Sequence, residues 1–136
     1  MKKDTKKAIA LLSLVGTLGG YFFGANALNS LTFQMSPRIE KSQVEEIIER
    51  EKTKQGFDKN IEVRFNNVGI NRAKKEDGRY VIMINERDLT RATVTHEAYH
   101  IVDGHVESYN RPLYFLMWEP KTAAYTFVDE MKRKLN

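Results

Sequence analysis

The stretch His96-Glu97-Ala98-Tyr99-His100 decides how this 136-residue sequence is interpreted. Residues four positions apart lie on one face of an α-helix, so the imidazoles of His96 and His100 can reach the same metal ion. Zinc binds neutral imidazole nitrogens at about 2.0–2.1 Å. Glu97 is one residue further round the helix, which places its carboxylate beside the ion and not on it. The spacing therefore predicts a helical zinc site with an acid–base residue next to it.

The sequence before this motif predicts one helix and a small sheet. A capping-box pattern from Ser42 and apolar residues at helical spacing predict a helix over 42–55, which Gly56 ends. Alternating or continuous apolar residues predict strands, over residues 61–65, 68–73 and 80–84. Residues 74–78 have turn chemistry, with Asp77-Gly78 as its strongest element. We therefore expect a small, mostly antiparallel sheet of two or three strands.

Two helices complete the predicted α+β fold. Asp88 or Thr90 can cap the motif helix, which runs to about Val102 and ends at Gly104. Pro120 is placed where a last helix can begin, since proline is tolerated at the first helical position. The motif thus follows a strand and a short loop directly, and the sequence after it returns to a helix.

A hydrophobic segment precedes this domain. Four lysines and one aspartate lie within the first seven residues, and no charged side chain follows from Ala8 to Pro37. This pattern is typical of a signal peptide, with Ala25-Asn26-Ala27 as a cleavage site, or of a retained membrane anchor over Ala8–Leu28. A buried helix of the domain itself is the third interpretation. We expect residues 1–37 to be a signal or anchor with a linker, and residues 38–136 to be the domain, facing outside the cytoplasm.

Charge and composition exclude some classes of function. The net charge is +4, of which the first seven residues supply +3, so the domain itself is nearly neutral. A nucleic-acid-binding domain carries its positive charge on the folded surface, so no nucleic-acid partner is expected. The chain has no cysteine, which excludes disulfides and cysteine-bound metal.

A catalytic zinc ion needs a third protein ligand beside the two histidines of the motif. Glu119, near the start of the last helix, is the first choice, because that helix can pack against the motif helix. His105 is the main alternative, since Gly104 can turn the chain back toward the metal. Asp103, close behind His100 in the sequence, is a third possibility.

The residues Thr95 to His100 resemble the active-site helix of zincin metallopeptidases. With Glu119 followed by Ala123, Ala124 and Phe127, the chain resembles the gluzincins, in which a later helix supplies a glutamate ligand. Its size and element order are similar to the minimal gluzincins of the ImmA/IrrE type, over about Ser42–Leu135. Those proteins are generally cytoplasmic, and Thr122 stands here where they usually have alanine. The metzincin pattern fits less well, because Gly104 and His105 are each displaced by one position.

The resemblance implies further site features. Zincins pair an extended peptide substrate with a sheet edge, and Val81–Ile84 is the strand that could serve, although its apolar residues equally suit a core strand. Zincins often stabilise the oxyanion with a tyrosine or histidine, and Tyr109, Tyr114 and Tyr125 are candidates. Phe115 and Trp118 are expected to be packing residues.

Three functions compete on this basis. The first is a membrane-anchored or exported zinc metallopeptidase with Glu97 as general base, acting on a peptide or protein substrate. The second is a non-catalytic zinc-binding regulatory or interaction protein on a zincin-like scaffold. The third is a membrane-anchored interaction protein without a metal. The oligomeric state follows from none of these patterns.

Overall fold

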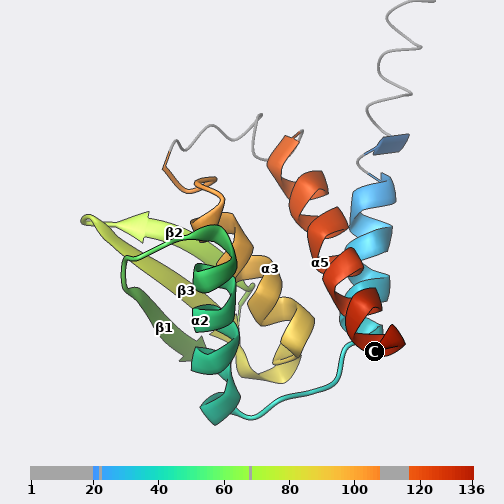
Figure 1. Ribbon diagram of the computed structural model, residues 1–136, viewed down its shortest axis with the longest axis horizontal. Helices are drawn as coiled ribbons and strands as arrows, with labels where there is room; N and C mark the ends of the chain where they lie inside the picture. Colours follow the sequence, from blue (N-terminus) through green and yellow to red (C-terminus); the bar gives the residue numbers. More distant parts are fainter. Residues whose placement is uncertain (1–19, 22, 68, 108–116) are drawn as a thin grey trace, which may run out of the picture.

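The structure is a computed structural model that describes residues 20–107, except 22 and 68, and residues 117–136. Its elements are a helix over residues 23–35, η1 (Lys41–Gln43), α2 (Val44–Gln55), β1 (Ile61–Asn66), β2 (Arg72–Glu76), β3 (Arg79–Asn85), η2 (Glu86–Asp88), α3 (Arg91–Val102) and α5 (Glu119–Leu135). The α+β class is therefore as predicted. The sheet forms one side of the molecule, α3 lies in the middle, and α5 and the first helix form the other side (Figure 1).

The sheet is mixed, so the prediction of a mostly antiparallel sheet is wrong for one of its pairings. β2 and β3 form an antiparallel hairpin, whose turn residues Asp77 and Gly78 both have positive φ, at 49° and 76°. β1 pairs with β3 in parallel, with Ile61 opposite Tyr80. The strand order is β1-β3-β2, because the chain passes from one edge of the sheet to the other before the hairpin fills the centre.

This order also corrects two expectations about the strands. Val81–Ile84 belongs to β3, the central strand, so it cannot be the sheet edge at which a substrate pairs. The edge strand β2 begins later than predicted. It includes Lys74, Lys75 and Glu76, which had been predicted to lie in a turn. Charged side chains are common on edge strands, where they discourage pairing with another chain.

The core forms where α2 and α3 pack against one face of the sheet. Alternate residues of β3, Tyr80, Ile82 and Ile84, are at most 3% exposed and face the helices. The two helices supply most of the other large core side chains, which are Val44, Ile47, Ile48, Val94 and Ile101, and Leu89 adds one from the loop before α3. This packing fixes α3 against the sheet, and the motif with it.

α3 has the ends that its sequence predicts. Thr90 is the N-cap, and its hydroxyl accepts a hydrogen bond from the Thr93 amide at 3.1 Å. Gly104, with φ at 78°, follows the C-cap. Almost every residue of the helix is buried, because the sheet and α2 cover one side while α5 covers another. The histidines of the motif are therefore interior residues.

The helix of residues 23–35 packs on this domain through a polar stripe. Asn29, Thr32 and Ser36 are buried, at positions spaced by one or two helical turns. The Ser36 hydroxyl donates to Glu130 of α5 and accepts from the Ala92 amide of α3, at 3.3 and 2.9 Å. Within the described residues no helix is long and apolar enough to cross a membrane. Most of the predicted signal or anchor, Ala8–Leu28, lies outside the described residues.

Candidate metal centre

Two helices bring three metal-binding side chains together. His96 and His100 project from α3, and Glu119 is the first residue of α5. The two oxygens of the carboxylate divide between the rings: Oε1 is 3.0 Å from Nε2 of His96, and Oε2 is 3.0 Å from Nε2 of His100. The two Nε2 atoms are 3.2 Å apart. The group has the composition and proximity of a site that could hold a metal ion.

The spacing of these atoms fits a small tetrahedral cation. With zinc–ligand bonds of about 2.0–2.1 Å, neighbouring ligand atoms around a tetrahedral ion are about 3.3–3.4 Å apart. The two imidazole nitrogens, 3.2 Å apart, need only a slight outward movement to match. Each of them is 3.0 Å from a different oxygen of Glu119, and either oxygen could be the third ligand atom. Two nitrogens and one carboxylate oxygen are also the donor set of many catalytic zinc sites, which keep a fourth position open.

The other two candidate ligands lie behind His100 and not at the cluster. Nδ1 of His105 is 2.9 Å from Nδ1 of His100, the ring nitrogen that faces away from Glu119. Nε2 of His105 is 2.6 Å from Oδ2 of Asp103, which also accepts from Lys121. One choice of tautomers satisfies this row of hydrogen bonds. Nδ1 of His100 donates to Nδ1 of His105, and Nε2 of His105 donates to Asp103. In this tautomer Nε2 of His100 carries no hydrogen and could bind a metal ion. In the other tautomer Nε2 carries the hydrogen and donates it to Oε2 of Glu119.

His96 also has a side chain behind its ring, but the contact is longer than those behind His100. Its Nδ1 is 3.5 Å from the hydroxyl of Thr126, one turn along α5 from Thr122. Its ring forms a T-shaped contact with Phe33 of the first helix, with centroids 5.6 Å apart and planes at 82°. The orientation of the ring is therefore set from two sides, by α5 and by the helix of residues 23–35.

Burial and hydrogen bonding tune the charges of the cluster. Burial lowers the pKa of His100 to about 4, so its ring is neutral at pH 7, which is the form that binds metal. Burial alone would raise the pKa of Glu119, but the hydrogen bonds with His100 and His96 hold it well below its usual range. The pKa of His96 is raised, because Glu119 and Glu97 outweigh its burial. A carboxylate thus lies between two imidazoles that differ in proton affinity.

Glu97 lies beside this cluster and is only 7% exposed. Burial raises the pKa of its carboxyl to about 7, and the charge of His96 is the largest opposing influence. The backbone amide of Ala73 donates a hydrogen bond to it, so the carboxylate lies next to the edge strand β2. A carboxyl group with a pKa near neutrality can both take up and release a proton at physiological pH.

The aromatic candidates are placed less favourably. The hydroxyl of Tyr125 donates to the buried Glu51 at 2.5 Å, and its ring stacks on Tyr99, so it is engaged elsewhere. Trp118 stacks on His105, with centroids 5.3 Å apart and planes at 3°, as expected of a packing residue. Tyr109, Tyr114 and Phe115 lie outside the described residues.

Sequence patterns did not single out Asn29, although it contacts the site directly. Its side-chain amide nitrogen donates to Oε1 of Glu119 at 2.9 Å. The residue lies in the uncharged stretch that resembles a signal or anchor, which concealed it. Its only signal is the polar spacing of Asn29, Thr32 and Ser36, which marks one face of a helix.

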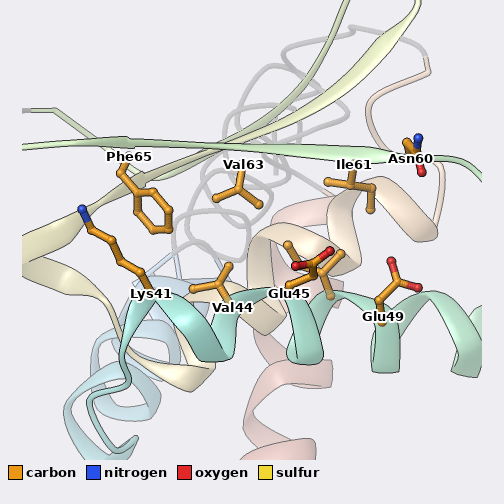
Figure 2. A pocket seen from close by; sticks show the side chains of 9 residues that line it. Lys41, Val44, Glu45, Glu49, Asn60, Ile61, Val63 and Phe65 are labelled. Carbon is orange, nitrogen blue, oxygen red and sulfur yellow. The ribbon is translucent and has the colours of Figure 1, made fainter.

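A hollow between α2 and β1 lies apart from the metal cluster. Figure 2 shows its lining, in which Val44 of α2 and Val63 of β1 face one another and charged or polar residues lie at the ends. The lining is Lys41, Val44, Glu45, Ile48, Glu49, Asn60, Ile61, Val63 and Phe65. None of these residues belongs to the motif or touches Glu119, so the hollow is not part of the candidate metal centre.

The chain was compared with protein families, curated proteins and solved structures. No family model matches it, and no curated protein or solved structure matches it either. The geometry of the residues themselves is therefore the basis for any functional conclusion.

Proposed function

We propose that this protein is a zinc-dependent metallopeptidase of the gluzincin type. The observation that carries the proposal is the convergence of His96, His100 and Glu119 within hydrogen-bond distance of one another, with Glu97 alongside. Glu119 and the motif are on different helices, 19 residues apart at the nearest, so local sequence does not force them together. The resemblance of the motif to zincins points to the same chemistry.

In this proposal His96, His100 and Glu119 hold the ion. Bound zinc supplies Lewis acidity toward a water molecule and toward the carbonyl of the scissile peptide bond. Glu97 accepts a proton from the attacking water and passes it to the leaving amine, so that its carboxylate is regenerated. His105 and Asp103 act behind His100, where their hydrogen bonds fix the ring and its tautomer.

The position of β2 suggests how a peptide would be presented. β2 is an edge strand, and its residue Ala73 donates to Glu97. An extended peptide lying along this edge would bring its backbone close to the carboxylate. β2 thus takes the role that Val81–Ile84 cannot have.

The proposal places the enzyme at a membrane or outside the cytoplasm. The support is the lysine-rich start followed by an uncharged stretch from Ala8 to Pro37. The helix of residues 23–35 is the later part of that stretch and packs on the domain. The catalytic residues would act on peptides or proteins on the outer side.

The test separates chemistry from metal binding. Purified full-length protein is loaded with zinc and incubated with a mixed-sequence peptide library, and new termini are detected by mass spectrometry. We expect one zinc per chain, and we expect Glu97→Gln to retain zinc while losing peptide hydrolysis by at least about 100-fold, as for loss of a general base. Glu45→Gln is the matched control, because Glu45 is an exposed carboxylate outside the cluster.

Other outcomes have defined meanings. A Glu97→Gln protein with full activity would overturn the role of Glu97. Wild-type protein that binds zinc but cleaves nothing would favour the non-catalytic zinc-binding alternative. Protein that binds no zinc would leave only a metal-free interaction protein.

A further inference from the structure

The helix of residues 23–35 touches two of the proposed metal ligands. Asn29 donates to Oε1 of Glu119 at 2.9 Å, and the ring of Phe33, one turn later, packs against that of His96 in a T-shaped arrangement. Both contacts come from the face of the helix that is buried against the domain. A segment whose composition is typical of export or anchoring therefore reaches the candidate metal centre.

The amide of Asn29 has a defined orientation. The carboxylate of Glu119 can only accept hydrogen bonds when ionised, so the nitrogen of the amide must face it. The carbonyl oxygen Oδ1 then points elsewhere, and it is buried with no hydrogen-bond partner among the residues that the structure describes. Asn29 as a whole is only 9% exposed.

An unpartnered buried carbonyl opposes folding. A leucine of similar shape at this position would avoid that penalty. Stability of the helix packing therefore does not explain an asparagine here. The hydrogen bond to Glu119 does explain it, because it is the one polar contact that the side chain makes among the described residues.

We propose that Asn29 is a positioning residue that orients Glu119 as a metal ligand. The helix of residues 23–35 would thereby contribute to the metal centre. The inference rests on the proposed zinc site. Oε1 of Glu119 lies between Asn29 and His96, so the hydrogen bond fixes the carboxylate on the side away from His100. A hydrogen bond that holds a ligand side chain in place makes metal binding tighter, because the side chain loses less conformational freedom when the ion binds.

The decisive variant is Asn29→Leu in the full chain, with Thr32→Val as the matched control. Thr32 is 1% exposed on the same buried face, but its hydroxyl donates only within its own helix, to the Leu28 carbonyl at 2.7 Å. Both substitutions remove one polar group and keep the number and branching of the side-chain heavy atoms. Zinc affinity is measured by competition with a chromophoric zinc chelator of known affinity, and the melting temperature of the metal-free protein is measured alongside.

We expect Asn29→Leu to weaken zinc binding about tenfold, the lower end of the range for a group behind a ligand, because Glu119 is partly exposed. The metal-free variant should still unfold cooperatively, with a melting temperature lowered only by the lost hydrogen bond to Glu119, and Thr32→Val should bind zinc normally. In a Glu119→Ala background, Asn29→Leu should have no further effect on zinc affinity. A purely structural role would lower the melting temperature and leave the zinc affinity of the folded protein unchanged.

Three results would overturn the inference. They are unchanged zinc affinity in Asn29→Leu, an equal loss in Thr32→Val, and an undiminished effect in the Glu119→Ala background. If Asn29→Leu does not fold cooperatively, Asn29→Ala takes its place with the same expectations for zinc. Zinc affinity is read without any substrate, so a failure of the wild type to cleave peptides bears on the proposed function and not on Asn29.

Discussion

Removal of Glu119 should reduce zinc affinity far more than removal of His105, although both side chains are within hydrogen-bond distance of His100. Oε2 of Glu119 meets Nε2 of His100, the atom that also faces His96. His105 meets the opposite nitrogen, Nδ1. Glu119→Ala therefore deletes a proposed ligand, whereas His105→Ala deletes a partner that holds a proposed ligand in place.

The expected difference can be worked out from the number of bonds lost. Zinc held by four protein ligands in small peptides has an apparent binding free energy of about 10–16 kcal/mol. One ligand then corresponds to about 2.5–4 kcal/mol, or about 100- to 1000-fold in affinity. Loss of a group behind a ligand weakens binding by about 10- to 100-fold. Glu119→Ala should thus exceed His105→Ala by about one order of magnitude.

Competition with a chromophoric chelator measures both variants on one scale. Glu45→Ala, which removes an exposed glutamate from α2, serves as the control for the substitution itself. Circular dichroism of each metal-free protein establishes that it is folded, since His105 also stacks on Trp118. Stoichiometry is obtained from metal analysis after gel filtration.

A reversed order of the two variants would refute the geometry. If His105→Ala abolished zinc binding while Glu119→Ala retained most of it, His105 would be the third ligand. The ring would then have to turn away from Asp103 and His100. Equal and small effects would show that neither residue is a ligand and that the cluster is a hydrogen-bonded polar core.

Three further predictions follow from the same structure. Free zinc at about 100 times its Kd should raise the free energy of unfolding by about 2.7 kcal/mol, seen as a higher melting temperature that a chelator reverses, whereas an unchanged melting temperature would argue against specific binding. Tyr125→Phe should lower the free energy of unfolding by about 1.5 kcal/mol in urea titrations without altering zinc affinity, because the fully buried Glu51 loses a donor but keeps Arg50. The intact mass of the protein isolated from membranes should show that the chain is not cut after Ala27, because a cut there would place Asn29 in the fraying first turn of its helix. A mature chain that begins at Leu28 and retains full zinc affinity would contradict this prediction.

Local sequence was sufficient to predict most of the individual elements. Gly56 ends α2 with φ at 64°, Asp77-Gly78 forms the hairpin turn, Thr90 caps α3, and Pro120 lies in the first turn of α5. Each of these depends on the conformational preferences of one or two residues, which neighbours in the chain reveal. The spacing of His96 and His100 belongs to the same class, because a helix alone places both rings on one face.

Tertiary structure decided how those elements meet. The pairing of β1 with β3 puts the most apolar strand in the centre, and no local pattern distinguishes this order from the expected one. The choice between Glu119 and His105 is of the same kind, because their distances from His100 in sequence do not say which nitrogen each will face. The contact of Asn29 with Glu119 spans 90 residues and was concealed in an uncharged stretch. Sequence by itself determined that His96, Glu97 and His100 lie together on one helix. The packing of α5 and of the first helix on α3 determined the rest of the candidate metal centre, because only packing brings distant residues within bonding distance.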